Sequence, residues 1–216
     1  MDLSRKTHII WDCNGTLLND RWLCVDVINA MLGERNQTLI TDEVYLKLFD
    51  FPVKDYYERI GFDFNLEPFE IVGKEFIDVY DKRQSECVLH DGAYQMVESF
   101  TKLGYRQSVL SARQHSSLIQ ELKTFNLYKN FDQISGLDSF HADGKEELGK
   151  ELIRTLGRDK AEIVMIGDTV HDCDVASLMG VDIILMAHGH HHIDRLGTCS
   201  VPVVTSFDDL NLLFAK

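Results

Sequence analysis

The stretch HIIWDCNGTLLND, residues 8–20, holds the signal that decides the fold of this chain. Its first residues belong to a short apolar run, residues 7–12, which predicts a buried strand ending at Asp12. A Gly-Thr turn begins at Gly15, so the aspartate stands where a strand ends and a turn begins. Asn14 lies two residues after the aspartate, which means that an amide stands where a second acid could have been.

A long helical pattern follows this strand. Residues 17–88 are mostly helical in pattern, because apolar residues recur at helical spacing, as at Trp22, Val25, Ile28 and Leu32. Nothing in this stretch alternates between strands and helices. It therefore differs in kind from the rest of the chain.

From about residue 88 onward, apolar strands alternate with amphipathic helices. We expect strands within residues 105–112, 131–135, 162–168 and 181–187, and a final short strand and helix within residues 202–214. This alternation predicts an α/β fold, with a Rossmann-like parallel sheet flanked by helices. We interpret the helical stretch as a cap inserted after the first strand. The expected domains are a core of residues 1–16 and 89–216 and a cap of residues 17–88.

Polar residues stand at the expected ends of three strands. Asp12, Ser111 and Asp168 are far apart in the sequence, yet each follows or closes an apolar run. In open parallel sheets, ligands bind outside the carboxyl ends of the strands. These three side chains are therefore expected to converge on one site.

Composition limits the partners of the chain. It has 216 residues, with 35 acidic and 22 basic ones, and a formal net charge of −13. This balance argues against a nucleic acid or an anionic membrane as a partner. No apolar run approaches the about 18–20 residues that span a bilayer, and the N-terminus lacks the apolar segment of a secretory signal. The five cysteines are scattered, which fits reduced thiols, so we expect a cytoplasmic protein.

Four motifs occur in an order that is typical of one family. They are WDCNGTL at residues 11–17, VLSA at 109–112, Lys145 within ADGKEEL, and IGDTVHD at 166–172. With these motifs the chain resembles the haloacid dehalogenase (HAD) superfamily, in particular its phosphoglycolate-phosphatase-like branch with a helical cap. The resemblance covers nearly the whole length. It implies a hydrolase of small phosphorylated metabolites.

The resemblance also implies a role for each motif. Asp12 would be the nucleophile that forms an aspartyl-phosphate. The cofactor would be Mg²⁺, a hard cation that prefers oxygen ligands. Its ligands would be the Asp12 carboxylate, the backbone carbonyl of Asn14 and the Asp168 carboxylate, with Asp172 assisting directly or through water.

The two middle motifs would hold the phosphoryl group. Ser111 would bind a phosphoryl oxygen through its hydroxyl, helped by the adjacent backbone N–H of Ala112. Lys145 would neutralise the charge that develops on the phosphoryl group and on the nucleophile. This is catalysis by positioning and electrostatics, as phosphoryl transfer generally is.

Asn14 departs from the family pattern, which has a second aspartate at this position. That aspartate protonates the leaving oxygen and later activates water, whereas an amide can form hydrogen bonds but cannot exchange a proton at neutral pH. The loss corresponds to a factor of about 10²–10⁴ in rate. Restoring the acid with Asn14→Asp is expected to speed the hydrolysis of alkyl phosphates, unless Asn14 is matched to its neighbours.

Three interpretations of Asn14 stay open at this point. The preferred one is a Mg²⁺-dependent phosphatase of small organic phosphates whose leaving groups need little protonation. The second is a slow or silent relative that binds a phosphate ligand. The third is a phosphonate hydrolase that uses a cap lysine to form a Schiff base, for which Lys54 in FPVKDYY is the candidate. The same stretch matches the cap loop that senses substrate in ordinary sugar-phosphatase relatives, where Lys54 would be a substrate contact. A dehalogenase fits least, because such enzymes lack the acidic motif that contains Asp168 and Asp172.

The sequence also contains a histidine-rich stretch, AHGHHHIDRLG, with His188, His190, His191 and His192. Such a run can bind transition metals. It contains glycine, follows an expected strand and has no periodic spacing, so we expect a surface loop. His171 and Cys13 are interpreted as structural neighbours of the motifs. The oligomeric state cannot be read from the sequence.

Overall fold

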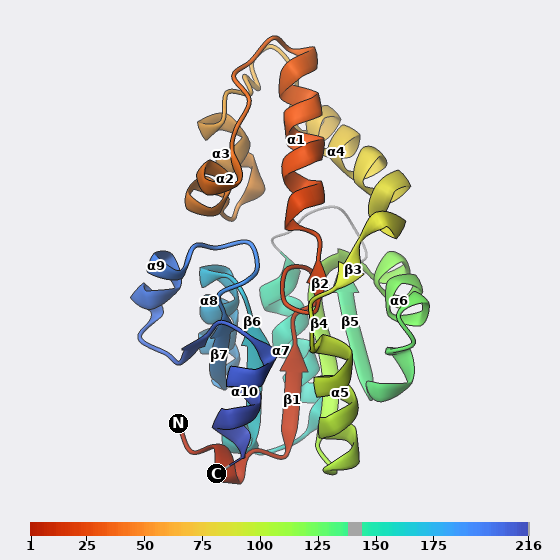
Figure 1. Cartoon of the computed structure of the whole chain (residues 1–216), viewed down its shortest axis with the longest axis vertical. Helices are drawn as coiled ribbons and strands as arrows, with labels where there is room; N and C mark the ends of the chain where they lie inside the picture. The colour runs from red at the N-terminus through yellow and green to blue at the C-terminus, as the bar shows by residue number, and fades with distance from the viewer. Residues whose placement is uncertain (138–143, 216) are drawn as a thin grey trace.

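A computed structural model describes residues 1–137 and 144–215, and it places the chain in two parts (Figure 1). A parallel sheet with helices on both faces forms the lower part in Figure 1, and a group of helices forms the upper part. Both termini lie at the end of the sheet that is remote from these upper helices. No helix in the described ranges is long and apolar enough to cross a membrane.

The sheet confirms the predicted α/β fold. All its strand pairs are parallel, in the order β5-β4-β1-β6-β7-β8. The strands are β1 (His8–Trp11), β4 (Arg106–Gln114), β5 (Gln133–Leu137), β6 (Ile163–Gly167), β7 (Asp182–Met186) and β8 (Val203–Val204). β1 lies in the centre between β4 and β6, so the residues that follow it reach the middle of the sheet edge.

The strands bury both faces because successive side chains point to opposite sides. Ile9 and Trp11 pack on one face with α5, α6 and α10, whereas Ile10 packs on the other with α7 and α8. The helices of the core are α5 (Ala93–Lys102), α6 (His115–Thr124), α7 (Lys145–Leu156), α8 (Val170–Met179), α9 (Ile193–Leu196) and α10 (Phe207–Phe214). Short 3₁₀ turns occupy Leu3–Arg5, Gln84–Glu86, Tyr128–Asn130, Lys160–Glu162 and Gly197–Cys199.

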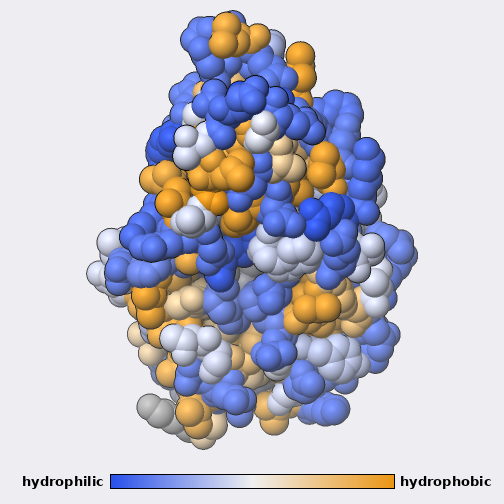
Figure 2. Space-filling view, turned by 45° about the horizontal axis from the view of Figure 1, so that its top comes forward, coloured by the Kyte–Doolittle hydropathy of each residue, from blue (hydrophilic) through white to orange (hydrophobic). Residues whose placement is uncertain are grey.

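The upper helices lie between β1 and the remainder of the sheet in sequence. We call α1 to α4 the helical insertion, namely α1 (Arg21–Glu34), α2 (Asp42–Leu48), α3 (Val53–Arg59) and α4 (Phe69–Arg83). It buries an apolar core of its own. Figure 2 shows further apolar side chains gathered on the upper half of its face, over this insertion and among polar ones.

Two details of the insertion differ from the sequence prediction. A pair of short antiparallel strands, β2 (Leu18–Asn19) and β3 (Val88–Leu89), joins the two ends of the insertion. β2 lies inside the range 17–88 that was expected to be mostly helical, and β3 lies at its end. Two-residue strands leave no periodicity to detect. The predicted stripe of α1 is only partly the buried face: Ile28 and Leu32 are buried as expected, but Trp22 is 38% exposed. Leu23 and Val27 are fully buried beside them.

The strand β4 is longer than predicted. It was expected to end near Ser111, but it continues to Gln114, with a register irregularity between Leu110 and Gln114. The pairing with β5 resumes where Gln114 lies beside Leu137. Ser111 therefore lies inside an irregular stretch of the strand and not after its end.

Candidate active site

Three aspartates meet at the carboxyl ends of β1 and β6. Asp12 follows β1, Asp168 follows β6, and Asp172 lies in the first turn of α8. The Asp12 N–H donates to the carbonyl of Ile166 at 2.8 Å, which ties the two strand ends together. Ligand oxygens of the three carboxylates all lie within 4.8 Å of one another, and all three residues are buried. We call these residues the aspartate cluster.

Among the lysines and arginines that the structure describes, Lys145 alone contacts this cluster. It opens α7, and its Nζ donates to Asp12 and, at 2.6 Å, to Asp172. Burial raises the pKa of Asp12 well above its usual value and that of Asp168 to about 6. Against the effect of burial, the Lys145 ammonium lowers the pKa of Asp172 to about 2. Of the three crowded acids, Asp12 and Asp172 therefore share the one ammonium.

Local hydrogen bonds explain the position of Asp172. Thr169 caps α8 by accepting from the Asp172 N–H at 3.1 Å, and Asp172 Oδ2 accepts from the Thr169 N–H at 3.0 Å. This reciprocal capping box satisfies the first turn of the helix. Because Oδ2 is occupied by the cap, Oδ1 is the atom that Asp172 turns toward Lys145.

The turn after β1 holds Asp168 in place. The Thr16 hydroxyl donates to Asp168 Oδ1 at 2.8 Å and lies 3.3 Å from Asp12 Oδ2. Gly15 has a φ of +78°, and a β-carbon there would collide with the Asp168 carboxylate. The Gly-Thr pair of the motif is therefore needed for both turn geometry and close approach.

Ser111 and Ala112 lie on β4, which is the neighbour of β1. In the register, Val109 is opposite Trp11, so Ser111 stands at the level of the residues just after Asp12. Its buried Oγ accepts from the Arg113 N–H at 3.1 Å. The hydroxyl proton of Ser111 has no acceptor among the described residues, so it can be donated to a ligand oxygen.

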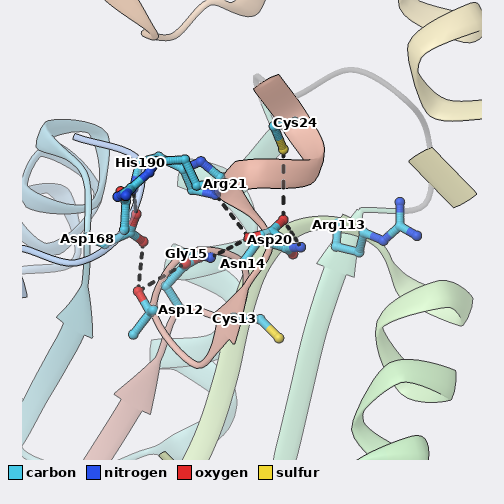
Figure 3. A network of polar contacts seen from close by, with 12 residues as sticks. Asp12, Cys13, Asn14, Gly15, Asp20, Arg21, Cys24, Arg113, Asp168 and His190 are labelled. Atoms are coloured by element: carbon cyan, nitrogen blue, oxygen red, sulfur yellow. Dashed lines mark hydrogen bonds and ion pairs between the residues drawn. The ribbon is translucent and has the colours of Figure 1, made fainter. Parts of the chain in front are cut away.

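A second buried centre lies beside the aspartate cluster (Figure 3). Asp20, at the start of α1, is 2% exposed and accepts from the Gly15 N–H at 2.9 Å, Asn14 Nδ2 at 2.9 Å and the Tyr80 hydroxyl at 2.7 Å. His190 Nε2 lies 3.2 Å from its other side. We call Asp20, Asn14, Tyr80 and His190 the Asp20 network.

The histidines of this region correct the sequence prediction. His190 is 5% exposed and His191 is fully buried, so the stretch that was expected to be a surface loop packs inside the molecule. His190 Nδ1 lies 2.9 Å from the Tyr45 hydroxyl, and the His190 N–H donates to Asp168 at 2.6 Å. Against the effect of burial, Asp20 raises the pKa of His190 to about 9. The loop was misjudged because its partners come from distant elements.

The same loop joins the core to the helical insertion. Arg21 on α1 donates to the carbonyls of His188 at 2.9 Å and Gly189 at 2.6 Å. The His192 N–H donates to the carbonyl of Leu46 at the end of α2. The insertion is therefore held over the strand ends by hydrogen bonds as well as by its connecting strands.

Three residues singled out from the sequence lie elsewhere. Lys54 is exposed on α3, with its Nζ 5.7 Å from the centre of the Phe64 ring, and no described contact joins it to the aspartate cluster. The Cys13 thiol points to buried Glu121 at 3.5 Å. His171 stacks on Phe51 with ring centres 4.5 Å apart. Ala142 and Asp143 of the ADGKEEL motif lie outside the described residues.

The sequence reasoning did not single out Asp20 or Tyr80, and it placed His190 in a surface loop. An aspartate before a helix is usually a cap, and Asp20 occupies that position, yet its side chain makes no cap hydrogen bond. Tyr80 lies in a helix that was predicted from its apolar spacing, and this spacing does not distinguish a functional side chain from a core one. The available signal was the amide at position 14, which needs an acceptor nearby.

Comparison with known proteins gives a family for this architecture. The family model of haloacid dehalogenase-like hydrolases matches residues 9–186. Pyrophosphatase PpaX from Listeria innocua is 25% identical over 171 residues, which are 78% of this chain and 77% of that protein. A phosphoglycolate phosphatase from Mesorhizobium japonicum is 21% identical over 216 residues, covering 96% of this chain and 94% of that protein.

A solved structure supports the fold. A haloacid dehalogenase-like hydrolase from Streptococcus pneumoniae superposes with a TM-score of 0.83 at 16% identity, over 97% of this chain and 99% of that one. At this identity the similarity concerns the fold alone. The match extends over both the sheet and the helical insertion.

Proposed function

We propose, from the premise that this chain belongs to the family of haloacid dehalogenase-like hydrolases, that it is a Mg²⁺-dependent phosphatase of small organic phosphates. The observation that carries this proposal is the aspartate cluster with Lys145 at the carboxyl ends of adjacent parallel strands. A nucleophilic carboxylate, a fixed cation and oxygen ligands for a metal are the parts that phosphoryl transfer needs.

In the proposed reaction, Asp12 attacks phosphorus. A bond forms between a carboxylate oxygen and phosphorus, while the bond between phosphorus and the ester oxygen breaks. The released alcohol or phenol takes its proton from water or from the substrate. Water then hydrolyses the aspartyl-phosphate and regenerates Asp12 with inorganic phosphate. Lys145, which already contacts Asp12, offsets negative charge during both steps.

The donor set of the cluster fits a magnesium ion. The three buried side chains offer carboxylate oxygens within 4.8 Å of one another, and hard cations prefer oxygen ligands. Asp12, the backbone carbonyl of Asn14 and Asp168 would hold the ion, with Asp172 assisting. When bound, the ion would reduce the repulsion between the acids and a phosphate.

The phosphate would be oriented from β4. The Ser111 hydroxyl has a proton to donate, and the N–H of Ala112 is the adjacent backbone donor. Both belong to the strand beside β1, so they would lie near the region in which Asp12 attacks. Hydrogen bonds to charged oxygens contribute about 1.5–3 kcal/mol each.

The helical insertion, with the proposed boundaries 17–88, would act as a cap that restricts the substrate to metabolite size. Nucleic acids and membrane surfaces would be excluded by the charge of −13, and the setting would be cytoplasmic. Lys54 would contact the substrate from the cap when it closes. The cap role and the Lys54 contact rest on the family, and the excluded partners rest on the charge.

Asn14 narrows the substrate class. Because an amide supplies no proton, the site favours leaving groups that depart as stable anions. Aryl phosphates have such a leaving group, and so do phosphoric anhydrides. The relative named pyrophosphatase PpaX therefore favours a second candidate, the hydrolysis of a phosphoanhydride at the same site.

A substrate panel with and without metal tests the proposal. Purified protein with Mg²⁺ should hydrolyse an aryl phosphate, lose this activity on chelation, and lose it in Asp12→Asn. The matched control is Asp208→Asn, an exposed aspartate in α10. If wild type and Asp12→Asn are equally inactive but bind phosphate esters, the protein is a binding relative. Turnover of an amino-aldehyde phosphonate would favour the phosphonate hydrolase, and turnover of a haloacid without metal would favour the dehalogenase.

A further inference from the structure

The Asp20 carboxylate receives hydrogen bonds from every side. Oδ1 accepts from the Gly15 N–H at 2.9 Å and faces His190 Nε2 at 3.2 Å. Oδ2 accepts from Asn14 Nδ2 at 2.9 Å and from the Tyr80 hydroxyl at 2.7 Å. An ionised carboxylate has acceptors and no donor. Any group that stands at the place of Asn14 Nδ2 must therefore donate.

The amide of Asn14 is fixed by these partners. Its Nδ2 donates to Asp20 at 2.9 Å and to the Tyr80 hydroxyl at 3.0 Å, so both protons are used. Its Oδ1 receives no hydrogen bond from a side chain or backbone group in the described ranges. The side chain thus presents an acceptor to a ligand and keeps its donors for Asp20.

A carboxylate at position 14 would not fit this arrangement. It would place a second acid about 2.9 Å from buried Asp20, with no proton between the two. Like charges at this distance in a buried site force one group to become neutral or the structure to move. The amide is therefore matched to its neighbour, whereas Asn14→Asp alone would set a second acid against Asp20.

We propose that Asp20 is a positioning residue that makes position 14 a site for an amide, and that the two residues act as a pair. Its part in the reaction rests on the proposed function, whereas the pairing itself does not. Asp20 holds Asn14 with the amide oxygen free for the ligand.

The pair can be exchanged without losing a hydrogen bond. In the double variant Asn14→Asp/Asp20→Asn, the new amide would donate from position 20 to the new carboxylate at position 14. The amide oxygen at position 20 would still accept from Gly15 and face His190. The Tyr80 hydroxyl can reverse its role, because a phenol both donates and accepts. The exchange should therefore be tolerated better than Asn14→Asp alone.

Thermal unfolding of the two single variants and the double variant tests the pairing without any assay of activity. We expect Asn14→Asp to lower Tm by about 5 °C or more, since 1 kcal/mol corresponds to about 2–4 °C at this chain length. The double variant should recover at least half of that loss, which is the signature of coupled neighbours. Additive losses would overturn the proposal. Asn211→Asp and Asp208→Asn, both exposed in α10, make the same chemical changes at side chains that have no hydrogen-bond partner among the described residues.

Turnover of an aryl and an alkyl phosphate tests the positioning role. The double variant should raise the ratio of alkyl to aryl turnover at least tenfold, because it has an acid at position 14 in a tolerated setting. Asn14→Asp alone should raise neither rate. If Asn14→Asp alone matches the double variant, Asp20 does not position residue 14. Coupling in Tm together with inactive wild type would support the pairing and reject only the proposed function.

Discussion

The aspartate cluster and the Asp20 network are both buried and both built around carboxylates, yet their negative charge is balanced to different degrees. In the cluster, the ammonium of Lys145 contacts two of the three acids, Asp12 and Asp172, while Asp168 accepts from the Thr16 hydroxyl and the His190 N–H. In the network, the carboxylate of Asp20 is surrounded by donors. The two touch through Gly15 and through His190, whose N–H donates to Asp168.

This difference indicates which of the two centres is expected to bind a ligand. Buried polar groups in folded proteins are generally paired, so an excess of acids marks a place where a cation is expected. A carboxylate that is fully paired has no such need and acts on its neighbours instead. We therefore assign chemistry to the cluster and positioning to the network.

Apart from substitution of Asp12 itself, the largest effect should come from Lys145→Met in the cluster. The substitution removes the ammonium that contacts Asp12 and Asp172, and the loss of one charge-stabilising group typically costs about 10²–10³ in rate. The turnover of an aryl phosphate with saturating Mg²⁺ measures it. Lys150→Met, on the outer face of the same helix, is the matched control. A loss below tenfold would mean that the cluster does not depend on its cation.

Glu121, a buried acid outside both centres, provides a pH test of the same reasoning. Burial raises the pKa of Glu121 from 4.5 to about 7, with Gln84 donating to it at 2.6 Å. Because the pKa of Glu121 is higher in the folded protein than in the unfolded chain, its contribution to stability is fully present below pH 4.5. This contribution is lost as the pH rises through about 7. The Tm of Glu121→Gln minus that of wild type should therefore increase by about 5 °C between pH 4.5 and pH 8. Exposed Glu58→Gln should leave the pH profile unchanged, and a parallel profile for Glu121→Gln would show that this acid is not held neutral.

Tyr80→Phe should have a smaller effect in the Asp20 network. It removes the hydroxyl that bonds Asp20 and Asn14, but leaves the direct bond between these two residues. One net hydrogen bond is worth about 1 kcal/mol, so turnover should fall by less than about tenfold. Aryl phosphate kinetics would measure this, with exposed Tyr128→Phe as control. A loss as large as that of Lys145→Met would erase the distinction between the two centres.

The smallest effect is expected at Lys54, which lies outside both centres. Its ammonium is exposed above the ring of Phe64, so Lys54→Ala should change the relative rates among substrates by a few-fold and leave an aryl phosphate nearly unaffected. Exposed Lys74→Ala on α4 is the control. Borohydride treatment with an amino-aldehyde phosphonate should give no adduct, and an adduct on Lys54 would establish the Schiff-base chemistry instead.

The two centres also show what the sequence could reveal. Asp12 and Asp168 were predicted to converge because apolar runs marked their strands and parallel strand ends meet at one edge. Lys145 and Asp172 came from the order of the motifs. The structure places all four together.

The network could not be read in the same way. Asp20 and His190 are 170 positions apart, and Tyr80 reaches Asp20 from a different helix, so no local pattern reports their contacts. The burial of His190 was missed for the same reason. Local periodicity predicts elements, whereas partners across the core and the insertion depend on how these elements pack.

The most direct test of the account is the site of covalent phosphorylation. Protein turning over an aryl phosphate with Mg²⁺ would be quenched in acid, and its peptides would be analysed by mass spectrometry. The account predicts a phosphoryl group on Asp12 that forms and decays with turnover and is missing in Asp12→Asn. A phosphoryl group on another residue, or steady turnover by Asp12→Asn, would contradict it.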